Sequence, residues 1–465
     1  MNPALSATVV LVYLAALVFV ALRARVARDF DEFSVARRAL PLALIFGSIA
    51  ATYVGPAFSI GFVGRGFHSG FLFLFVGLAY AVQNILVGLL VAPRLRELKG
   101  CFTLGDAIGQ KYGRKAQIIA GLISLGICTG FSAVMIKAGS LVLTDTLRLP
   151  LWLSVCLVAA ITASYTTFGG LRASVITDAF HFALFAILLP VTLLCAMFFH
   201  FNGGPAAFSA EAPVATLNGL RSTPAIEIVG LTVAFLLGET LIPPYANLAL
   251  ASRTSRVSKC GFITAGIFSI LWFAVMTATG IMARCIVPSD TPEDHVLLEL
   301  VRSLMPIGGY SLLLVALVSI VLSSLDSLLN AGAVVFTEDI VKPLTALSDR
   351  TALLVGRRAT IVIATIAAVC VPAVPSIIGG LLICYTVWAS AILPAAIIGL
   401  WVKNPRPLAG VLSMGVGTLV AIIAIAIVST PDFQTKTRVT IIPALGAALA
   451  AYLIGHRFGK IRAGA

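Results

Sequence analysis

Long apolar runs, separated only by short polar segments, repeat along the whole chain of 465 residues. Runs of about 20 residues are long enough for a helix to cross the hydrocarbon core of a bilayer. The first run has no basic residue before it and no small-residue cleavage site after it, so it is expected to be a retained helix rather than a signal peptide. The pattern predicts thirteen spans, at residues 4–22, 40–64, 70–92, 116–144, 150–168, 173–200, 226–250, 260–286, 308–336, 357–376, 378–402, 408–429 and 439–456.

The composition supports a polytopic, all-α membrane protein. Hydrophobic residues make up 59% of the chain and charged residues only 11%, with a mean hydropathy of +1.05. A soluble domain is about one quarter charged, so this chain cannot build a water-facing shell. The eight cysteines form no close pair of the CxxC type, and they indicate neither a metal cage nor a disulfide framework.

The net charge of +13 is explained by topology. If the N-terminus lies outside, 24 of the 32 Lys and Arg residues fall in cytoplasmic segments, 7 fall outside and Lys137 lies within a span. Basic residues concentrate in this way in the cytoplasmic loops of membrane proteins. We therefore expect a multi-pass protein of the cell membrane with an external N-terminus and a cytoplasmic C-terminus, and no nucleic-acid partner.

Two predicted spans contain helix-breaking residues near their centres. The second span reads "FGSIAATYVGPAFSIG", with Gly55 and Pro56, and the seventh reads "FLLGETLIPPYANLAL", with Gly238, Pro243 and Pro244. These spans are five apart, so each would open one half of an inverted repeat. Interrupted helices at matching positions point to a transporter site, because unwound backbone offers carbonyls and amides to ions and substrate. The alternative is a pair of proline kinks without function.

Few ionisable residues lie at depth, where such residues usually mark an ion or substrate path. Glu239 lies inside the second broken stretch. Asp178 is either part of such a path or a carboxylate at a helix end, and His181 is expected to be a packing residue. Lys137 either extends toward the interface or pairs with a carboxylate. Asp326 belongs to a polar group of its own.

That group lies in the stretch "IVLSSLDSLL" at residues 320–329, which places Ser323, Ser324, Asp326 and Ser327 near the middle of a span. Sodium is a hard cation that prefers oxygen ligands. The adjacent hydroxyls of Ser323 and Ser324, together with carbonyls of a neighbouring broken helix, would form a sodium site. In the alternative, the serines bond their own helix or let two helices approach closely.

Two longer stretches resemble motifs of the sodium/solute symporter family. They are "TTFGGLRASVITDAFH", with a glycine pair followed by a TD pair, and "SSLDSLLNAGAVVFTEDI", the family's ninth-span motif in its aspartate–serine form. The resemblance runs from about residue 30 to 405. It implies a ten-helix core at 40–404 of two inverted five-helix repeats, whose first and sixth helices are broken. A leading helix and cytoplasmic loop would occupy 1–39, and two trailing helices with a short cytoplasmic tail 405–465.

The resemblance also implies site residues. The sodium ligands would be the hydroxyls of Ser323 and Ser324 and the carbonyls of Ile320, Ile45 and Ser48, with Asp178 near the ion path. The substrate-facing positions would be Thr52, Phe71, Phe235, Gly238 and Glu239, joined by Lys137 if it faces the site. His181 stands where many members have glutamine, and "LIPPYANL" stands where they have an NQxxxQR-like stretch. The second departure falls at the substrate site, so the family's substrates are not carried over.

The sequence therefore predicts a sodium-coupled symporter that imports a small polar organic solute, such as an amino acid or a carboxylate, by alternating access. Its partners would be Na+ as coupling ion, the solute and the lipid bilayer, with no organic cofactor and no enzymatic activity. Alternatives are a proton-coupled carrier of the same fold that uses Asp178 or Glu239, and a transporter-like solute sensor. The sensor would need an appended signalling domain, and only nine residues follow His456. An intramembrane hydrolase lacks paired catalytic residues at a usable spacing.

Overall fold

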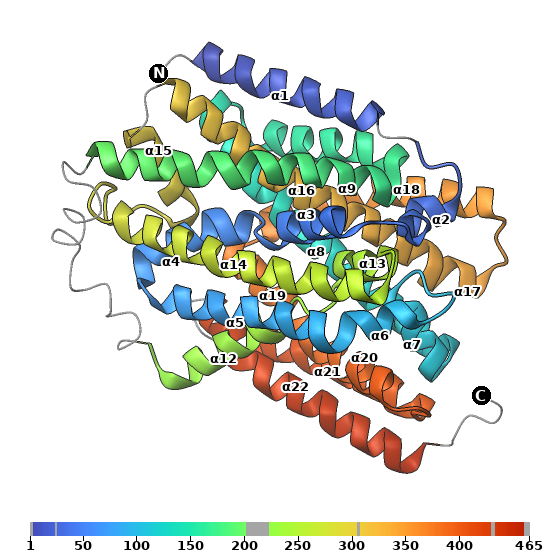
Figure 1. Cartoon of the computed structure of the whole chain (residues 1–465). Coiled ribbons are helices and arrows are strands. Elements are labelled where there is room, and N and C mark those ends of the chain that lie inside the picture. Colours follow the sequence, from blue (N-terminus) through green and yellow to red (C-terminus); the bar gives the residue numbers. More distant parts are fainter. Residues whose placement is uncertain (1–2, 24–25, 201–222, 305–306, 429–432, 460–465) are drawn as a thin grey trace.

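The computed structural model describes residues 3–23, 26–200, 223–304, 307–428 and 433–459, and this part of the chain forms a helical bundle without β-strands (Figure 1). The prediction of an all-α protein is confirmed. The longer helices are α1 (Pro3–Arg23), α3 (Leu42–Tyr53), α5 (Leu72–Leu86), α8 (Arg114–Leu147), α9 (Leu151–His200), α12 (Ala225–Leu237), α14 (Ser255–Ala283), α16 (Ile307–Val335), α18 (Asp349–Cys370), α19 (Ile377–Ala391), α21 (Pro407–Ile427) and α22 (Phe433–Phe458).

Shorter helices cap these elements or continue them after a break. The α-helices are α2 (Phe30–Val35), α4 (Phe62–Ser69), α6 (Ala92–Glu97), α7 (Leu104–Tyr112), α13 (Pro243–Ala251), α15 (Val296–Leu304), α17 (Lys342–Leu344) and α20 (Leu393–Trp401). Three π-helical turns, η2 (Ala57–Gly61), η3 (Val87–Val91) and η6 (Phe336–Val341), and three 3-10 turns, η1 (Ala36–Arg38), η5 (Glu293–His295) and η7 (Val371–Ala373), complete the described elements.

Eight helices of the described part are long and apolar enough to cross a membrane, and two bent helix pairs raise the number to ten if each is one span. The predicted spans at 150–168 and 173–200 both fall on α9, where Gly170 is the non-helical residue, with φ of +60°. Only glycine fits there, because a Cβ atom on Gly170 would lie 2.7 Å from the Cα atom of Phe33. The multi-pass architecture is confirmed, and the count of thirteen stays a prediction.

Both predicted helix breaks are present. The chain leaves α3 after Tyr53 and continues through η2 into α4 at an angle of 56°. Pro56 lies at this break and has no N–H group to continue the helical ladder. Between α12 and α13 the chain is non-helical at residues 238–242, where Leu241 has φ of +51°, and α13 starts on Pro243 and Pro244. A third bend, of 42°, separates α19 from α20.

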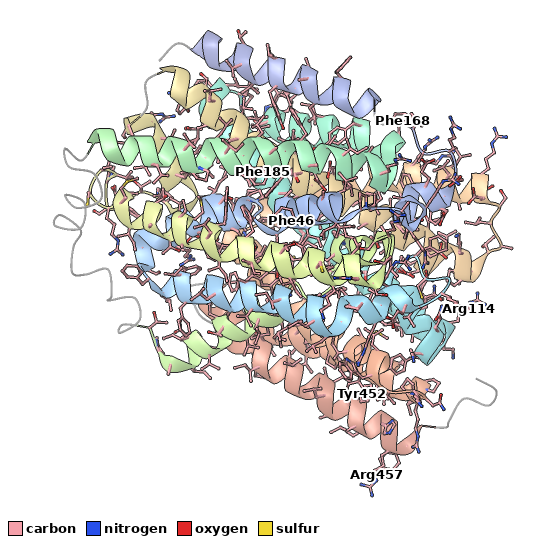
Figure 2. The ribbon with its side chains drawn as sticks, in the orientation of Figure 1. Phe46, Arg114, Phe168, Phe185, Tyr452 and Arg457 are labelled. Carbon is pink, nitrogen blue, oxygen red and sulfur yellow. The ribbon has the colours of Figure 1, made fainter. Side chains whose placement is uncertain are left out.

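The centre of the bundle is α16, which packs against α8 and α9, and 94% of the most apolar stretch of its span is buried. The broken helix α3 packs on α9, α14 and α16, and α13 also reaches α16. On opposite sides of the bundle lie α1, against α16 and α9, and the pair α21–α22, against α19 (Figure 1). Side chains fill the spaces between the helices (Figure 2), among them the fully buried Phe185.

One end of the bundle ties the two broken segments together. The amide of Leu40, before α3, donates to the carbonyl of Ala251 at 3.2 Å, and the amide of Arg253 donates to Leu40 at 3.0 Å. The guanidinium of Arg96 donates to the carbonyls of Ser252 at 2.5 Å and Arg253 at 3.3 Å. The start of α3 and the end of α13 are therefore held side by side at this end.

Candidate functional site

A group of hydroxyls surrounds the buried carboxylate of Asp178 on α9. Ser323 of α16 donates to its Oδ1 atom at 2.6 Å, and Ser327 donates to Oδ2 at 3.2 Å. Ser48 of α3 also donates to Oδ2. We call Ser48, Asp178, Ser323 and Ser327 the carboxylate–serine cluster. It joins the two halves of the protein, because α3 and α9 come from the first half of the chain and α16 comes from the second.

A second buried carboxylate, Asp326, adjoins this cluster. Ser174 donates to its Oδ1 atom at 2.9 Å and lies 3.3 Å from the hydroxyl of Ser327, while Thr177 donates to Oδ2 at 3.1 Å. None of the ion pairs found among the described residues involves Asp178 or Asp326. Buried charge without a partner is costly, so these carboxylates either take up a proton or pair with a cation.

Unused oxygen atoms lie where α16 meets the break after α3. The hydroxyl of Ser324 is buried and has no hydrogen-bond partner within the described structure, and the same holds for the hydroxyl of Thr52. A Cβ atom on Gly55 would lie 2.7 Å from the Ser324 Oγ atom, so this hydroxyl directly faces the broken backbone. The amide of Gly55 donates to the carbonyl of Thr52 at 3.3 Å, which leaves the carbonyl of Ala51 without its usual helical donor.

The predicted sodium ligands fall into two groups. Ile320 is buried in α16, one turn before Ser324. Ile45 and Ser48 lie inside the regular part of α3, where a carbonyl accepts the amide four residues later. The break begins only after Tyr53, one to two turns further along than these residues. Ser48 therefore reaches the carboxylate–serine cluster through its hydroxyl, whereas the carbonyl freed by the break belongs to Ala51.

Three tyrosines converge on Glu239, in the break between α12 and α13. The hydroxyl of Tyr385 on α19 donates to Oε1 at 2.6 Å, and that of Tyr245 on α13 donates to Oε2 at 3.0 Å. Tyr80 of α5 also donates to Oε2. We call Tyr80, Glu239, Tyr245 and Tyr385 the glutamate–tyrosine cluster. Glu239 is 5% exposed, so it is nearly sealed from solvent.

Aromatic rings surround this cluster. Tyr80 is stacked between Tyr53, with ring centroids 4.0 Å apart, and Phe58, at 4.2 Å. Phe235 stands edge-on to Tyr385 at 5.5 Å and to Tyr80 at 6.1 Å. Tyr53 is the last residue of α3, so one side of this aromatic shell starts at the same break that faces Ser324.

Gly238 permits the close packing of the second break. A Cβ atom at this position would lie 2.2 Å from the Tyr385 ring, so any side chain would displace the tyrosine that donates a hydrogen bond to Glu239. The neighbouring backbone is fixed as well, because the Trp388 indole donates to the carbonyl of Thr240 at 2.8 Å. Gln83 donates to the Thr240 hydroxyl at 2.8 Å and accepts from Tyr53, which links the two breaks.

The predicted substrate residues are only partly gathered here. Phe235, Gly238 and Glu239 lie at the glutamate–tyrosine cluster, and Thr52 lies beside Ser324 at the other break. Phe71, at the start of α5, is 40% exposed. The ammonium group of Lys137 donates to the carbonyls of Val374 at 2.6 Å and Pro375 at 3.0 Å, and these contacts do not join it to Glu239.

The three tyrosines that donate hydrogen bonds to Glu239 were not predicted from the sequence. A signal was present, because a tyrosine within an apolar span needs a partner for its hydroxyl, and few polar residues were available to provide one. Ser174 and Thr177, whose hydroxyls bind Asp326, were not predicted either. His181, expected to be a packing residue, lies against α1, with its Nδ1 atom 2.8 Å from the Tyr13 hydroxyl.

Comparison with known proteins gives consistent matches. The model of the sodium:solute symporter family matches residues 33–403. Sodium/glucose cotransporter 1 of Ovis aries is 26% identical over 402 residues, which cover 76% of this chain and 60% of that protein. The sodium/glucose cotransporter of Vibrio parahaemolyticus is 25% identical over 382 residues, covering 74% and 69%. The chain thus spans about 60% of the length of the sheep protein.

Solved structures share the architecture. A Na+-coupled sialic acid symporter in a substrate-bound, outward-open state has a TM-score of 0.84, with 99% of both chains covered at 17% sequence identity. A transporter of the nucleobase-cation-symport-1 family in a closed conformation has a TM-score of 0.56, at 12% identity. The likeness confirms the predicted fold, an inverted-repeat transporter bundle with broken helices.

Proposed function

This chain belongs to the sodium:solute symporter family, and from that premise we propose that it is a sodium-coupled importer of a small polar organic solute. The observation that carries the proposal is the unused Ser324 hydroxyl beside the broken backbone of α3, next to the carboxylate–serine cluster. A sodium ion needs several oxygens to replace its hydration shell. In this proposal, hydroxyl oxygens of α16, the carboxylate of α9 and backbone carbonyls of α3 and α16 supply them.

The proposed sodium ligands are the hydroxyls of Ser323 and Ser324 and the carbonyl of Ile320, with Asp178 supplying negative charge close by. From α3 we propose the carbonyl of Ala51 in place of those of Ile45 and Ser48, because its usual donor, the Gly55 amide, bonds to Thr52 instead. An ion held between α3 and α16 would attach the first broken helix to the centre of the bundle.

Sodium and solute would be coupled through that break. Its residues Thr52 and Gly55 adjoin Ser324, while Tyr53 stacks on Tyr80, which binds Glu239. An ion that fixes the backbone here also fixes one wall of the glutamate–tyrosine cluster. Coupling of this kind is reciprocal, so the factor by which sodium raises solute affinity equals the factor by which the solute raises sodium affinity.

A proton-coupled carrier of the same fold is the second candidate, favoured by the proximity of Asp178 and Asp326. The two candidates differ in the coupling ion and in the chemical groups that bind it. A proton needs only one carboxylate, whereas a sodium ion also needs oxygens such as the hydroxyl of Ser324 and the carbonyl of Ala51. Thermal unfolding of the purified protein in NaCl and in KCl at one fixed pH separates the candidates.

Substitution of both serines by alanine tests the sodium site. Ser323→Ala/Ser324→Ala removes two oxygen ligands and hardly changes the volume, so we expect the apparent sodium affinity to fall by at least about tenfold. The measurement is a sodium titration of the unfolding temperature at constant ionic strength, made up with KCl. The matched control is Ser164→Ala/Ser303→Ala, which removes two exposed hydroxyls from α9 and α15. An unshifted titration in a folded double mutant contradicts the site.

A further inference from the structure

We propose that the solute carries an ammonium group, which Glu239 and the aromatic rings around it bind. This inference rests on the proposed function as a solute carrier and names the chemical class of its substrate. The rings in question are those of Phe235 and Tyr385, because both faces of Tyr80 are already covered by Tyr53 and Phe58.

Within the described structure, Glu239 is a buried carboxylate whose hydrogen-bond donors are all hydroxyl groups. Three tyrosine hydroxyls donate to its carboxylate, which is the arrangement that an ionised carboxylate uses. All ion pairs found among the described residues use other carboxylates, so no Lys, Arg or His of that part of the protein is paired with Glu239. A cationic solute would supply the missing charge.

The carboxylate of Glu239 has capacity for a further hydrogen bond. An ionised carboxylate accepts about four hydrogen bonds. Oε2 takes the hydroxyls of Tyr80 and Tyr245, whereas Oε1 takes only that of Tyr385. The free position is therefore on Oε1, beside the ring of Tyr385, where an N–H group of the solute can donate.

The surroundings of Glu239 are mainly aromatic. Aromatic rings attract organic cations through their faces, most strongly where water is excluded, and they provide few hydrogen bonds. The hydroxyls of Tyr80 and Tyr385 are already used by Glu239, and Phe58 and Phe235 have none. A polyol would need several donors and acceptors here, so the set of side chains fits an ammonium group better than it fits a sugar.

A purely structural role for Glu239 makes a different prediction. The cluster joins α5, α13 and α19, so its hydrogen bonds also hold three helices together. Glu239→Gln keeps the shape and removes the charge. If Glu239 acts only as an anchor, this variant has lower stability but the same ligand preference. If Glu239 binds an ammonium group, the variant loses the preference for charge.

The experiment uses the purified full-length protein and three small probes. Choline and ethanolamine carry an ammonium group, and 3,3-dimethylbutan-1-ol is the neutral analogue of choline in which carbon replaces the nitrogen. Binding is measured by isothermal titration calorimetry in NaCl and, separately, in KCl. We expect at least one of the two cations to bind. If choline binds, the neutral alcohol should bind at least about tenfold more weakly than choline. Glu239→Gln should lose at least about tenfold in affinity for the cation.

The matched control is Glu97→Gln, the same chemical change at an exposed position at the end of α6. It should retain wild-type binding. The inference is overturned if neither cation binds wild-type protein, or if Glu239→Gln binds the cation as tightly as wild type does. Failure of sodium coupling would be seen in a separate measurement. In that case the protein would have the same unfolding temperature in NaCl and in KCl, whether or not the probes bind.

Discussion

The serines around Asp178 can donate hydrogen bonds to this carboxylate with or without a bound ion, because a hydroxyl group both donates and accepts. In the described arrangement, Ser323 and Ser327 donate to Asp178, which satisfies the carboxylate. A cation that binds the lone pairs of Ser323 does not displace its proton, so the bond to Asp178 can persist. The serine next along, Ser324, lacks such a bond and is the one that faces the break. The two adjacent serines thus make different contacts although their side chains are identical.

At the residue scale, Asp106 of α7 gives a pH-dependent prediction. Its carboxylate accepts the amide of Phe102 at 2.8 Å and the side chain of Gln117 at 2.6 Å. Burial, followed by the nearby charge of Glu338, raises the pKa of Asp106 from 3.8 to about 7. Since this pKa is higher in the folded state than in the unfolded chain, the folded protein binds the extra proton between these values. Stability therefore falls as pH rises through this window.

The measurement is the unfolding temperature from pH 5 to 8 in wild type and in Asp106→Asn, whose side chain stays neutral. We expect the wild-type temperature to fall with rising pH and this fall to shrink in Asp106→Asn by at least about 2 °C. Asp290→Asn, which makes the same change at an exposed loop position, is the control. Equal slopes in all three proteins would show that Asp106 titrates normally.

At the element scale, the broken helices were predictable and their chemical surroundings were not. Pro56 and Pro243 indicate breaks in the sequence itself, because proline cannot continue the hydrogen-bond ladder of a helix. The partners of Glu239 come from α5, α13 and α19, and only the packing of these helices brings Tyr80 and Tyr385 together. Periodicity gives the apolar spans but not which helices adjoin.

The precise position of a break was also beyond the sequence. The family resemblance pointed to carbonyls of Ile45 and Ser48, yet α3 stays regular through Tyr53. Pro56 does not fix where the ladder ends, because that depends on the hydrogen bond from the Gly55 amide to Thr52. For Lys137, the span prediction gave only its depth. Its contacts with Val374 and Pro375 depend on how the chain turns between η7 and α19.

Arg96 provides a test of the contact between the broken helices. Its guanidinium holds the carbonyls of Ser252 and Arg253, where the chain leaving α13 lies beside Leu40. Arg96→Gln should weaken this closed end, because a neutral, shorter side chain cannot make both bonds. A cysteine at the buried position Ser252 should then react with a maleimide at least about threefold faster, since local opening exposes it.

The comparison is made in a cysteine-free background with Ser252→Cys alone. Arg114→Gln, at an exposed arginine where α8 begins, is the matched control. An unchanged reaction rate in Arg96→Gln would mean that the backbone bridge at Leu40 keeps this end closed without the arginine.

At the scale of the whole molecule, basic residues from distant parts of the chain lie at the same end of the bundle. Arg114, at the start of α8, and Arg457, near the end of α22, both lie toward the right-hand end of the bundle (Figure 2). The short helices α2, α7 and α17 lie toward the same end (Figure 1). Both arginines belong to segments that the sequence assigns to the cytoplasm, so this end is predicted to be the cytoplasmic face. On this prediction, the end held together by Arg96 faces the cytoplasm.

The orientation is the last prediction, and labelling of single cysteines in intact cells tests it. Ala346 follows α17 at the basic end, and Ser289 lies between α14 and α15 at the other, and both are exposed. In a cysteine-free background, we expect a membrane-impermeant maleimide to label Ser289→Cys in intact cells and to label Ala346→Cys only after permeabilisation. The reason is that basic loops are retained on the cytoplasmic side during insertion. Labelling of Ala346→Cys but not Ser289→Cys in intact cells would reverse the orientation, and the end held together by Arg96 would then face the outside.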